Sequence, residues 1–141
     1  FRQLIDYVKQ MDKQAKPSGW TPDLLLWFML NSRLKEQEKL KYAETLAYPR
    51  LYNGLYKVIQ APNAAAAKDA LNKYLDRWYN LNSDAPWYNS HLKDNCYRGY
   101  WAWEVAAVAK IMHIDDSDLK NNQYYPYDMV HWADNETTAK E

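Results

Sequence analysis

Apolar positions recur at helical spacing along most of the chain, and no stretch alternates with the period of two that predicts a strand. In the first segment the apolar residues share one helical face: Leu4, Ile5, Val8 and Met11. The sequence Lys-Pro-Ser-Gly at 16–19 ends this predicted helix. Thr21, Pro22 and Asp23 then stand in the order of a helix cap, a first helical residue and an early acid. They are expected to open a second helix, whose apolar run extends through Leu30.

The next predicted helices are separated by polar or proline-containing breaks. The charged stretch 33–41 is expected to continue the second helix, with its charges paired along one face. Pro49 opens a helix through Ile59, and Asn63 caps another over 64–79. This last helix carries apolar side chains at positions i, i+3, i+4, i+7 and i+8: Leu71, Tyr74, Leu75, Trp78 and Tyr79.

The second half of the chain contains the most apolar stretch, at 99–112. Because this stretch is apolar nearly all round, we expect it to form a helix that is central to the fold. A short helical turn is predicted over 87–92, and Pro126 starts a last short helix through Trp132, followed by a polar tail. Together the elements predict an all-α fold, a single-domain bundle over 1–141 with about five or six helices.

Tyrosine and tryptophan dominate the aromatic residues, with 13 Tyr and 7 Trp against 2 Phe. Their polar tips favour cores with hydrogen-bonded rims and surfaces that bind partners. Cys96 is the only cysteine, which excludes an intrachain disulfide and suggests the reducing cytoplasm. No apolar run of about eighteen residues predicts a membrane span, so we expect a soluble protein. Because the chain begins at Phe1 inside a predicted helix, we expect a preceding N-terminal segment to be missing from this sequence.

The charges balance over the whole chain but not along it. Eighteen basic and eighteen acidic residues argue against a nucleic-acid coat and a membrane-surface protein. Residues 1–60 hold ten Lys/Arg and six Asp/Glu, a balance of +4, whereas residues 112–141 hold two and seven, a balance of −5. The chain therefore has a basic beginning and an acidic end.

Two groups of residues resemble metal sites, but neither has the required pattern. His91, Asp94 and Cys96 are close in sequence, yet they form none of the paired spacings that zinc sites use. The three acids at 115–118 lack the turn glycine and the distal glutamate of a calcium loop, so helix capping explains them better. We therefore predict no metal and no cofactor.

The remaining candidates for chemistry are a cysteine and a glutamate. Cys96 with His91 or His113 would need a neighbouring positive charge, and His113 is explained by its place at a helix C-terminus. Glu104 lies alone among aromatic and small residues, where it is either a catalytic acid or a structural hydrogen-bond acceptor. An unpaired buried carboxylate costs several kcal/mol. We favour a structural hub in which Glu104 is the acceptor and its neighbours supply donors. The hub residues are Glu104, Trp101, Trp103, Tyr97 and Tyr100.

An ordered set of five motifs between about 71 and 132 resembles the C-terminal domain of the PoNi family. The motifs are Trp78-Tyr79, then Trp87-Tyr88-Asn89-Ser90-His91, then Tyr97-x-Gly99-Tyr100-Trp101-x-x-Glu104-x-Ala106-Ala107-Val108-Ala109-Lys110, then Ile114-Asp115-Asp116-Ser117 and Tyr125-Pro126-Tyr127-Asp128. Val105 stands where the family pattern has Ala, and no motif of the family is recognised in the first seventy residues.

The resemblance implies an α-helical immunity protein that is not an enzyme. Such proteins bind PoNe-type DNase toxins, which bacteria deliver to one another, often by type VI secretion, and they protect the producing cell in its cytoplasm. Since a DNase presents a basic groove to phosphate, an inhibitor gains from an acidic face. From charge and expected exposure we predict toxin contacts at these acids and aromatic anchors: Asp94, Asp115, Asp116, Asp118, Asp128, Tyr124 and Tyr125.

Two alternatives from other classes stay open at this point. The chain could be a small α-helical hydrolase that uses Glu104 with His91 or His113, in which case Glu104 should open into a pocket beside a histidine. It could also be a helical scaffold or a homodimer, which would show a large apolar patch repeated across a two-fold axis.

Overall fold

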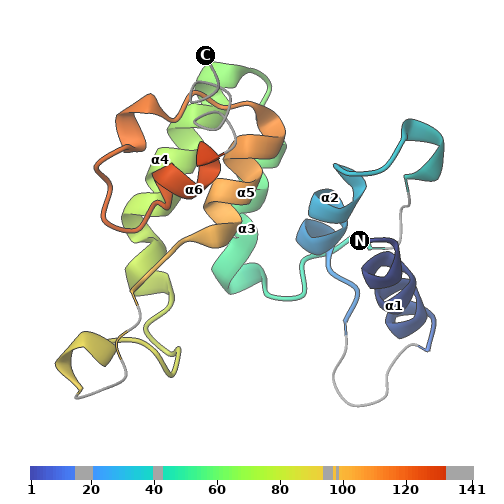
Figure 1. Ribbon diagram of the computed structural model, residues 1–141, viewed down its shortest axis with the longest axis horizontal. Coiled ribbons are helices and arrows are strands. Elements are labelled where there is room, and N and C mark those ends of the chain that lie inside the picture. The colour runs from blue at the N-terminus through green and yellow to red at the C-terminus, as the bar shows by residue number, and fades with distance from the viewer. Residues whose placement is uncertain (15–20, 40–42, 94–96, 98, 133–141) are drawn as a thin grey trace. The chain divides into compact units, whose positions relative to one another are not determined.

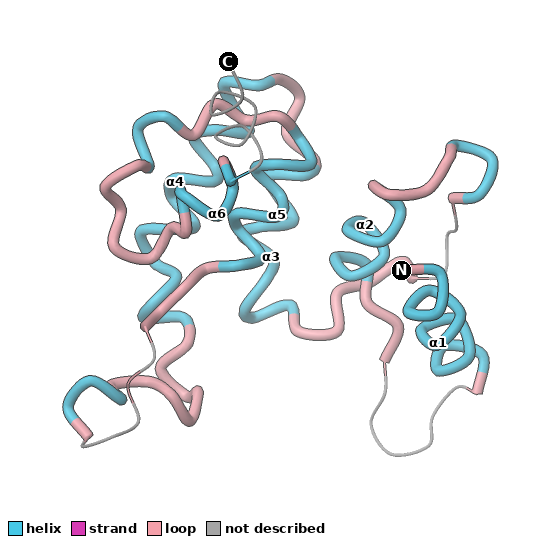
Figure 2. The backbone as a smooth tube through the Cα atoms, viewed as in Figure 1, coloured by secondary structure: helices cyan, strands magenta, loops and turns pink. Residues whose placement is uncertain are grey.

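The computed structural model describes residues 1–14, 21–39, 43–93, 97 and 99–132. The chain divides into two compact units, Phe1–Asn53 and Gly54–Glu141, which are described in turn. The described residues form six α-helices and three short 3₁₀-helices and contain no strand (Figures 1 and 2). The predicted all-α fold with five or six helices is thus confirmed.

The first unit is built around α1 (Arg2–Lys13) and α2 (Leu24–Asn31). Its core packs apolar side chains of both helices against one another: Ile5, Val8, Trp27 and Leu30. The buried carboxylate of Asp12 is not left unpaired, because Oδ2 accepts a hydrogen bond from the indole Nε1 of Trp27 at 2.6 Å. This pairing joins the two helices through a polar contact inside an apolar core.

The start of α2 differs from the prediction that Thr21 caps it and Pro22 is its first residue. The cap is Asp23, whose Oδ1 accepts from the backbone N–H of Leu26 at 2.7 Å. Its Oδ2 accepts from the backbone N–H of Ala47 at 2.7 Å, so one carboxylate satisfies two backbone donors. A carboxylate with both roles is a better cap here than a hydroxyl with one.

The predicted continuation of this helix through 33–41 is wrong. The helix ends at Asn31, and Ser32 Oγ donates to the carbonyl of Met29 at 2.6 Å. Among the described residues up to Lys39, the 3₁₀-helix Glu36–Glu38 follows. The charged residues still pair with each other, since Lys39 Nζ lies 2.6 Å from Glu36 Oε2. Charge pairing on a helix face contributes only tenths of a kcal/mol, which does not by itself extend a helix without an apolar face.

Helix α3 (Pro49–Ile59) and helix α4 (Ala64–Leu81) agree with their predicted bounds and signals. Asn63 caps α4, because its side-chain oxygen accepts from the backbone N–H of Ala66 at 2.9 Å. Helix α4 buries four of the five residues that the spacing predicted, Leu71, Tyr74, Leu75 and Trp78, whereas Tyr79 is only half-buried. Gly54 lets α3 approach this face closely, since a Cβ there would lie 2.7 Å from the Tyr74 ring.

Helix α5 (Trp103–Met112) begins four residues later than predicted. Gly99 has a φ of +86° and Ala102 is not helical, so the stretch before Trp103 is an irregular approach to the helix. The helix buries one face, Val105, Ala106, Val108 and Ala109, while the Trp103 side chain is 52 % exposed. It contacts α4 and the short helix α6 (Tyr127–Val130). Its expected position at the centre of the fold stays a prediction.

The remaining segments are short turns that connect the helices. The 3₁₀-helices Ser90–Leu92 and Ser117–Leu119 lie in the predicted turn regions, and α6 starts after Pro126 but ends at Val130 rather than at Trp132. Figure 1 shows α4, α5 and α6 side by side. No helix in the described part of the chain has both the length and the apolar character needed to cross a bilayer.

Candidate functional site

The acidic residues at 115–118 do not share one environment. Asp115 and Asp118 are exposed and flank the ammonium of Lys68, whose Nζ lies 2.9 Å from Asp115 Oδ2 and 3.0 Å from Asp118 Oδ1. Hydrogen bonds from Lys68, and then from Ser117, lower the pKa of Asp115 to about 2. The hydrogen bond from Lys68 likewise lowers the pKa of Asp118. Both carboxylates are therefore ionised at neutral pH, and one ammonium offsets only half of their charge.

Asp116 contradicts its predicted exposure, since it is only 6 % exposed. Its Oδ2 accepts from the Tyr125 hydroxyl at 2.7 Å, and its Oδ1 lies 2.9 Å from His131 Nε2. Tyr125 is itself 2 % exposed, so its predicted exposure as an anchor is also wrong. Burial, and then the hydrogen bond to Asp116, raise the pKa of Tyr125, which keeps its proton on the hydroxyl. These contacts join Tyr125, just before α6, and His131, just after it, to the acidic turn at 115–118. The Asp116 carboxylate is therefore not exposed to a partner.

Glu104 lies in the first turn of α5 and contacts α4. Its Oε1 accepts a hydrogen bond from the indole Nε1 of Trp78 at 2.5 Å. Burial raises the pKa of Glu104, while hydrogen bonds from its own backbone N–H and from Trp78 oppose that rise. The predicted donors Trp101 and Trp103 are 43 % and 52 % exposed, and neither makes this contact among the described residues. The acceptor role of Glu104 is therefore present, with a different tryptophan as its donor.

Aromatic rings cluster around Trp78 and its neighbour Tyr79. Trp78 stacks on Trp87 with ring centroids 5.5 Å apart, and Tyr79 stacks on Tyr124 at 5.3 Å with the planes 3° apart. The Tyr100 ring joins the same cluster, 5.1 Å from Tyr79. Because the cluster holds Tyr124 partly buried against Tyr79, only part of that side chain is available to a partner.

The hydroxyl of Tyr100 holds the segment that contains His91. It accepts from the backbone N–H of His91 at 3.0 Å and from Ser90 Oγ at 3.2 Å, and it lies 2.7 Å from His91 Nδ1. Burial raises the pKa of Tyr100, but the hydrogen bonds from Ser90 and His91 outweigh it and lower that pKa below its usual value. Tyr97 is exposed and packs edge-on to Tyr100 at 5.0 Å. Tyr97 and Tyr100 therefore position His91, and among the described residues no hydrogen bond joins either of them to Glu104.

The histidines do not form an acid–base set with Glu104. Within the described ranges no hydrogen bond joins Glu104 to His91 or His113. His113 is instead the residue that ends α5, in the left-handed conformation with φ 53° and ψ 40°. The described residues also contain no group of three or more His, Cys, Asp or Glu that could hold a metal ion. Asp94 and Cys96 lie outside the described residues.

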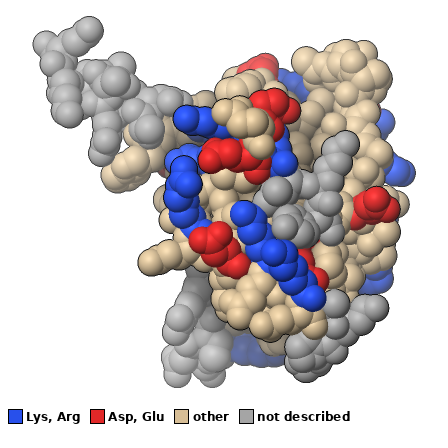
Figure 3. Space-filling view, turned by 90° about the vertical axis from the view of Figure 1, so that its right-hand side faces the viewer, with Lys and Arg blue, Asp and Glu red and all other residues tan. Residues whose placement is uncertain are grey.

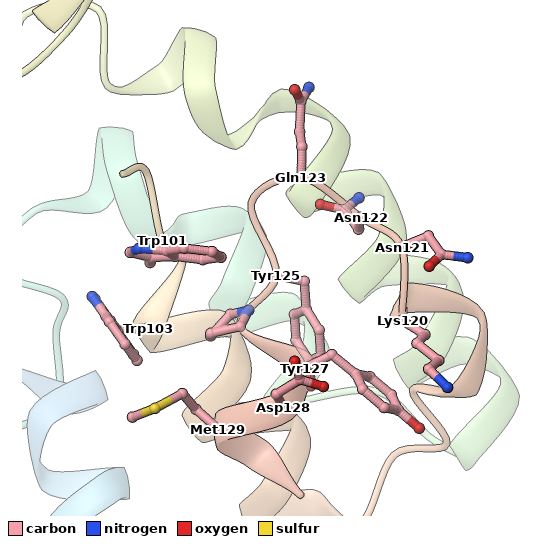
Figure 4. A pocket seen from close by; sticks show the side chains of 11 residues that line it. Trp101, Trp103, Lys120, Asn121, Asn122, Gln123, Tyr125, Tyr127, Asp128 and Met129 are labelled. Atoms are coloured by element: carbon pink, nitrogen blue, oxygen red, sulfur yellow. The ribbon is translucent and has the colours of Figure 1, made fainter. Parts of the chain in front are cut away.

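A surface cavity of about 510 Å³ lies beside the start of α5 and α6. Trp101 and Trp103 form one of its sides, and the residues at 120–123 and 125–129 form the rest. Figure 4 shows Trp103 beside Met129, with Lys120 at the opposite side of the cavity. Met129 is 62 % exposed, so the cavity has an apolar rim that water reaches.

The position of Trp101 depends on Gly99. A Cβ at Gly99 would lie 2.5 Å from the indole Nε1 of Trp101, and the φ of +86° also disfavours any other residue there. The indole therefore folds back over a bare backbone at the edge of the cavity. Trp101 and Trp103 were expected in the hub around Glu104, and the cavity that they line was not predicted.

The comparisons with known proteins give one match. A family model described as PoNe immunity proteins (PoNi), C-terminal, matches residues 21–129. The chain belongs to the PoNi family. Its members are immunity proteins against PoNe nuclease toxins. No curated protein matches the chain, and no solved structure matches it.

The PoNi match extends well beyond the motifs that the sequence analysis recognised. It covers 109 of the 141 residues, counted from 21 to 129, whereas the resemblance was recognised only from about residue 71. The match thus includes α2, α3 and α4 as well as every residue of the cavity up to Met129. The acids at 115–118, Asp128, the Glu104–Trp78 contact and the cavity all belong to the PoNi part of the chain.

Proposed function

We propose that this PoNi protein binds a cognate PoNe-like DNase toxin and neutralises it stoichiometrically. The observation that carries the proposal is the family match over residues 21–129. Binding takes place in the cytoplasm of the producing bacterium, and the toxin belongs to a system that delivers effectors between bacteria, such as type VI secretion. The PoNi protein acts by occupying a surface of the nuclease rather than by chemistry.

The charge of the exposed acids supports a contact with a nuclease. A DNase binds the phosphate backbone with basic side chains, so an acidic partner can occupy the same surface. Asp115, Asp118 and Asp128 are exposed, and we propose them as toxin contacts together with Asp94 and the exposed part of Tyr124. Asp116 and Tyr125 support this surface from inside through their hydrogen bond.

The proposed acidic contact surface does not form a continuous negative patch, because lysines lie among its carboxylates. Lys68 lies between Asp115 and Asp118, and Lys73 pairs with Asp69 at 2.7 Å on the same helix α4. On the face shown in Figure 3, Lys and Arg side chains also lie next to Asp and Glu side chains. A partner recognised by this protein must therefore match individual charges, which favours specificity over general attraction.

The surroundings of Glu104 support a role without catalysis. A general acid needs a reacting group within hydrogen-bond reach and a path to solvent. Glu104 has the indole of Trp78 at that distance, and neither His91 nor His113 is bonded to it. We infer that the carboxylate stabilises the junction of α4 and α5 and that the hydrolase alternative has no site here.

Co-expression tests the proposal. Bacteria that express the nuclease domain of a cognate PoNe-type toxin should lose viability and degrade their DNA. The PoNi protein, expressed at comparable levels, should prevent both effects. The Glu104→Gln variant should protect as well as the wild type if it remains folded. Death of the cells despite soluble PoNi protein, with no complex recovered, would contradict the proposal.

A further inference from the structure

The cavity beside α5 and α6 exposes two indole rings at one place. Trp101 and Trp103 are 43 % and 52 % exposed, and their ring centroids lie 6.5 Å apart. Met129 adds a third exposed apolar side chain next to Trp103 (Figure 4). Monomeric proteins rarely leave large apolar side chains clustered in a hollow without a partner, and exposed tryptophans are the residues that most often dominate binding energy.

The cavity is shaped before any partner arrives. Gly99 leaves room for the Trp101 indole by having no Cβ, and the Ala102 backbone N–H holds the approach to α5 by donating to the Tyr124 carbonyl at 2.8 Å. The opposite wall includes Tyr125, whose hydroxyl donates a hydrogen bond to the buried Asp116. A partner that enters therefore does not have to order these walls, which lowers the entropic cost of binding.

The cavity offers one carboxylate that a cation can bind. Asp128 is exposed in the first turn of α6 and lines the cavity. The other charged lining residue is Lys120, which lies across the cavity from the indoles in Figure 4. The lining therefore has no net charge, and Asp128 is the group in it that a cation can pair with.

We propose that this cavity receives an arginine side chain from the DNA-binding surface of the toxin. The inference rests on the proposed function and names the place and the chemistry of the contact. The guanidinium stacks on the exposed indole faces of Trp101 and Trp103 and pairs with the carboxylate of Asp128, while its methylene stem packs against Met129. Arginine fits this combination better than lysine, because its planar group can stack and bind a carboxylate at once.

Such a contact accounts for inhibition as well as binding. An arginine that a nuclease uses to hold a phosphate cannot hold it while its guanidinium is bound to a carboxylate and two indoles. The cavity would then mimic the phosphate by charge and the stacked base by its rings. The paired acids Asp115 and Asp118 form a second, separate contact in this account.

Binding measurements with matched variants test the assignment. The probe is the purified nuclease domain of a cognate PoNe-type toxin, carrying a substitution that abolishes cleavage. Trp103→Ala should weaken its binding by at least about thirtyfold, because a central tryptophan anchor is worth about 2 kcal/mol or more. Trp132→Ala is the control, since Trp132 is 65 % exposed but does not line the cavity. It should change the affinity by less than about threefold.

Charge variants separate a cationic occupant from an apolar one. Asp128→Asn should weaken binding by about tenfold and Asp128→Glu by much less, whereas Asp76→Lys, a change at an exposed acid of α4, should have little effect. If Trp103→Ala weakens binding but Asp128→Asn does not, the occupant is apolar and the arginine assignment is wrong.

Two further outcomes are distinct from each other. If the wild type binds the nuclease domain and the Trp103 and Asp128 variants bind it equally well, the cavity is not the contact, although the proposed function stands. If the wild type does not bind at all, the proposed function fails and the inference fails with it. Sedimentation of the PoNi protein alone tests for another occupant of the cavity. If the wild type forms a dimer that Trp103→Ala dissociates, a second copy of the chain fills the cavity and the arginine assignment is wrong.

Discussion

Trp78 donates its indole N–H to the Glu104 carboxylate across 2.5 Å and thereby joins α4 to the first turn of α5. The first unit contains the same kind of contact, in which Trp27 donates to the buried Asp12 at 2.6 Å. In both places a carboxylate inside an apolar environment receives a donor from an aromatic side chain that also fills the core. This pairing allows an acid to be buried without the cost of leaving it unsatisfied.

Trp78→Phe should destabilise the protein by about 2–4 kcal/mol. The substitution keeps an aromatic ring in a buried position but removes the N–H donor to a partly buried carboxylate, and it leaves a small cavity. Urea unfolding followed by far-UV circular dichroism measures the change. Trp87→Phe is the matched control, because Trp87 stacks on Trp78 but is 37 % exposed. Equal losses in the two variants would show that the Glu104 contact contributes nothing beyond packing.

The pH dependence of stability should carry the signature of Glu104. Burial raises its pKa above the ordinary value of 4.5 in the folded state, so the unfolded state ionises first as the pH rises. The stabilisation that Glu104 contributes is therefore fully present below pH 4.5. It is lost as the pH rises through the raised pKa of Glu104 in the folded state.

Glu104→Gln removes that titration while keeping an acceptor for Trp78. Compared with the variant, the wild type should be relatively more stable at about pH 4 than at about pH 7, and denaturant titrations at both values measure the difference. A wild type that gains stability over the variant as the pH rises would contradict the burial of this carboxylate.

Lys68→Met should raise the pKa of Asp115 from about 2 toward its ordinary value of 3.8. The hydrogen bond from Ser117 remains in the variant, so the return is partial. Carboxyl chemical shifts followed by NMR through an acid titration give the pKa directly. In the wild type, the stability from this carboxylate is present above 3.8 and is lost as the pH falls to about 2. Lys73→Met, which removes the partner of Asp69, should leave Asp115 unchanged.

Reversing the charge of the Asp115 and Asp118 pair should slow association with the nuclease. Exposed charges act mainly on the rate of encounter, so the association rate constant of the double Lys variant should fall by about tenfold or more at low salt, and its salt dependence should weaken. Stopped-flow measurements at several salt concentrations test this. A double variant with Asp6→Lys and Asp76→Lys, both at exposed acids, controls for the change in net charge. An unchanged association rate would place the interface away from this turn.

Local signals in the sequence were sufficient for most of the helices. Asn63 and Pro49 mark helix starts through their own side chains, and the apolar spacing of α4 identifies its buried face without knowledge of its neighbours. The errors occur where a distant residue decides the outcome. Asp23 replaces Thr21 as a cap partly because its second oxygen also holds Ala47, 24 residues away in sequence.

The candidate site was less predictable because it depends on contacts between segments. Asp115, Asp116 and Asp118 look alike in sequence, but Asp116 alone turns inward to meet Tyr125 and His131. The Glu104 donor lies 26 residues before it on another helix, so neighbouring tryptophans were chosen instead. The cavity exists only because the approach to α5 and the start of α6 lie together, and no local pattern encodes that.

Stoichiometric inhibition of the nuclease is the most direct test of the central claim. Increasing amounts of the PoNi protein are added to a fixed, higher-than-Kd concentration of the active nuclease domain, and the initial rate of DNA cleavage is measured. The account predicts a linear fall that reaches the baseline at one PoNi protein per nuclease domain, with no dependence on the time of prior incubation once binding is complete. Unchanged cleavage at a several-fold excess, or progressive inactivation by substoichiometric amounts, would contradict it.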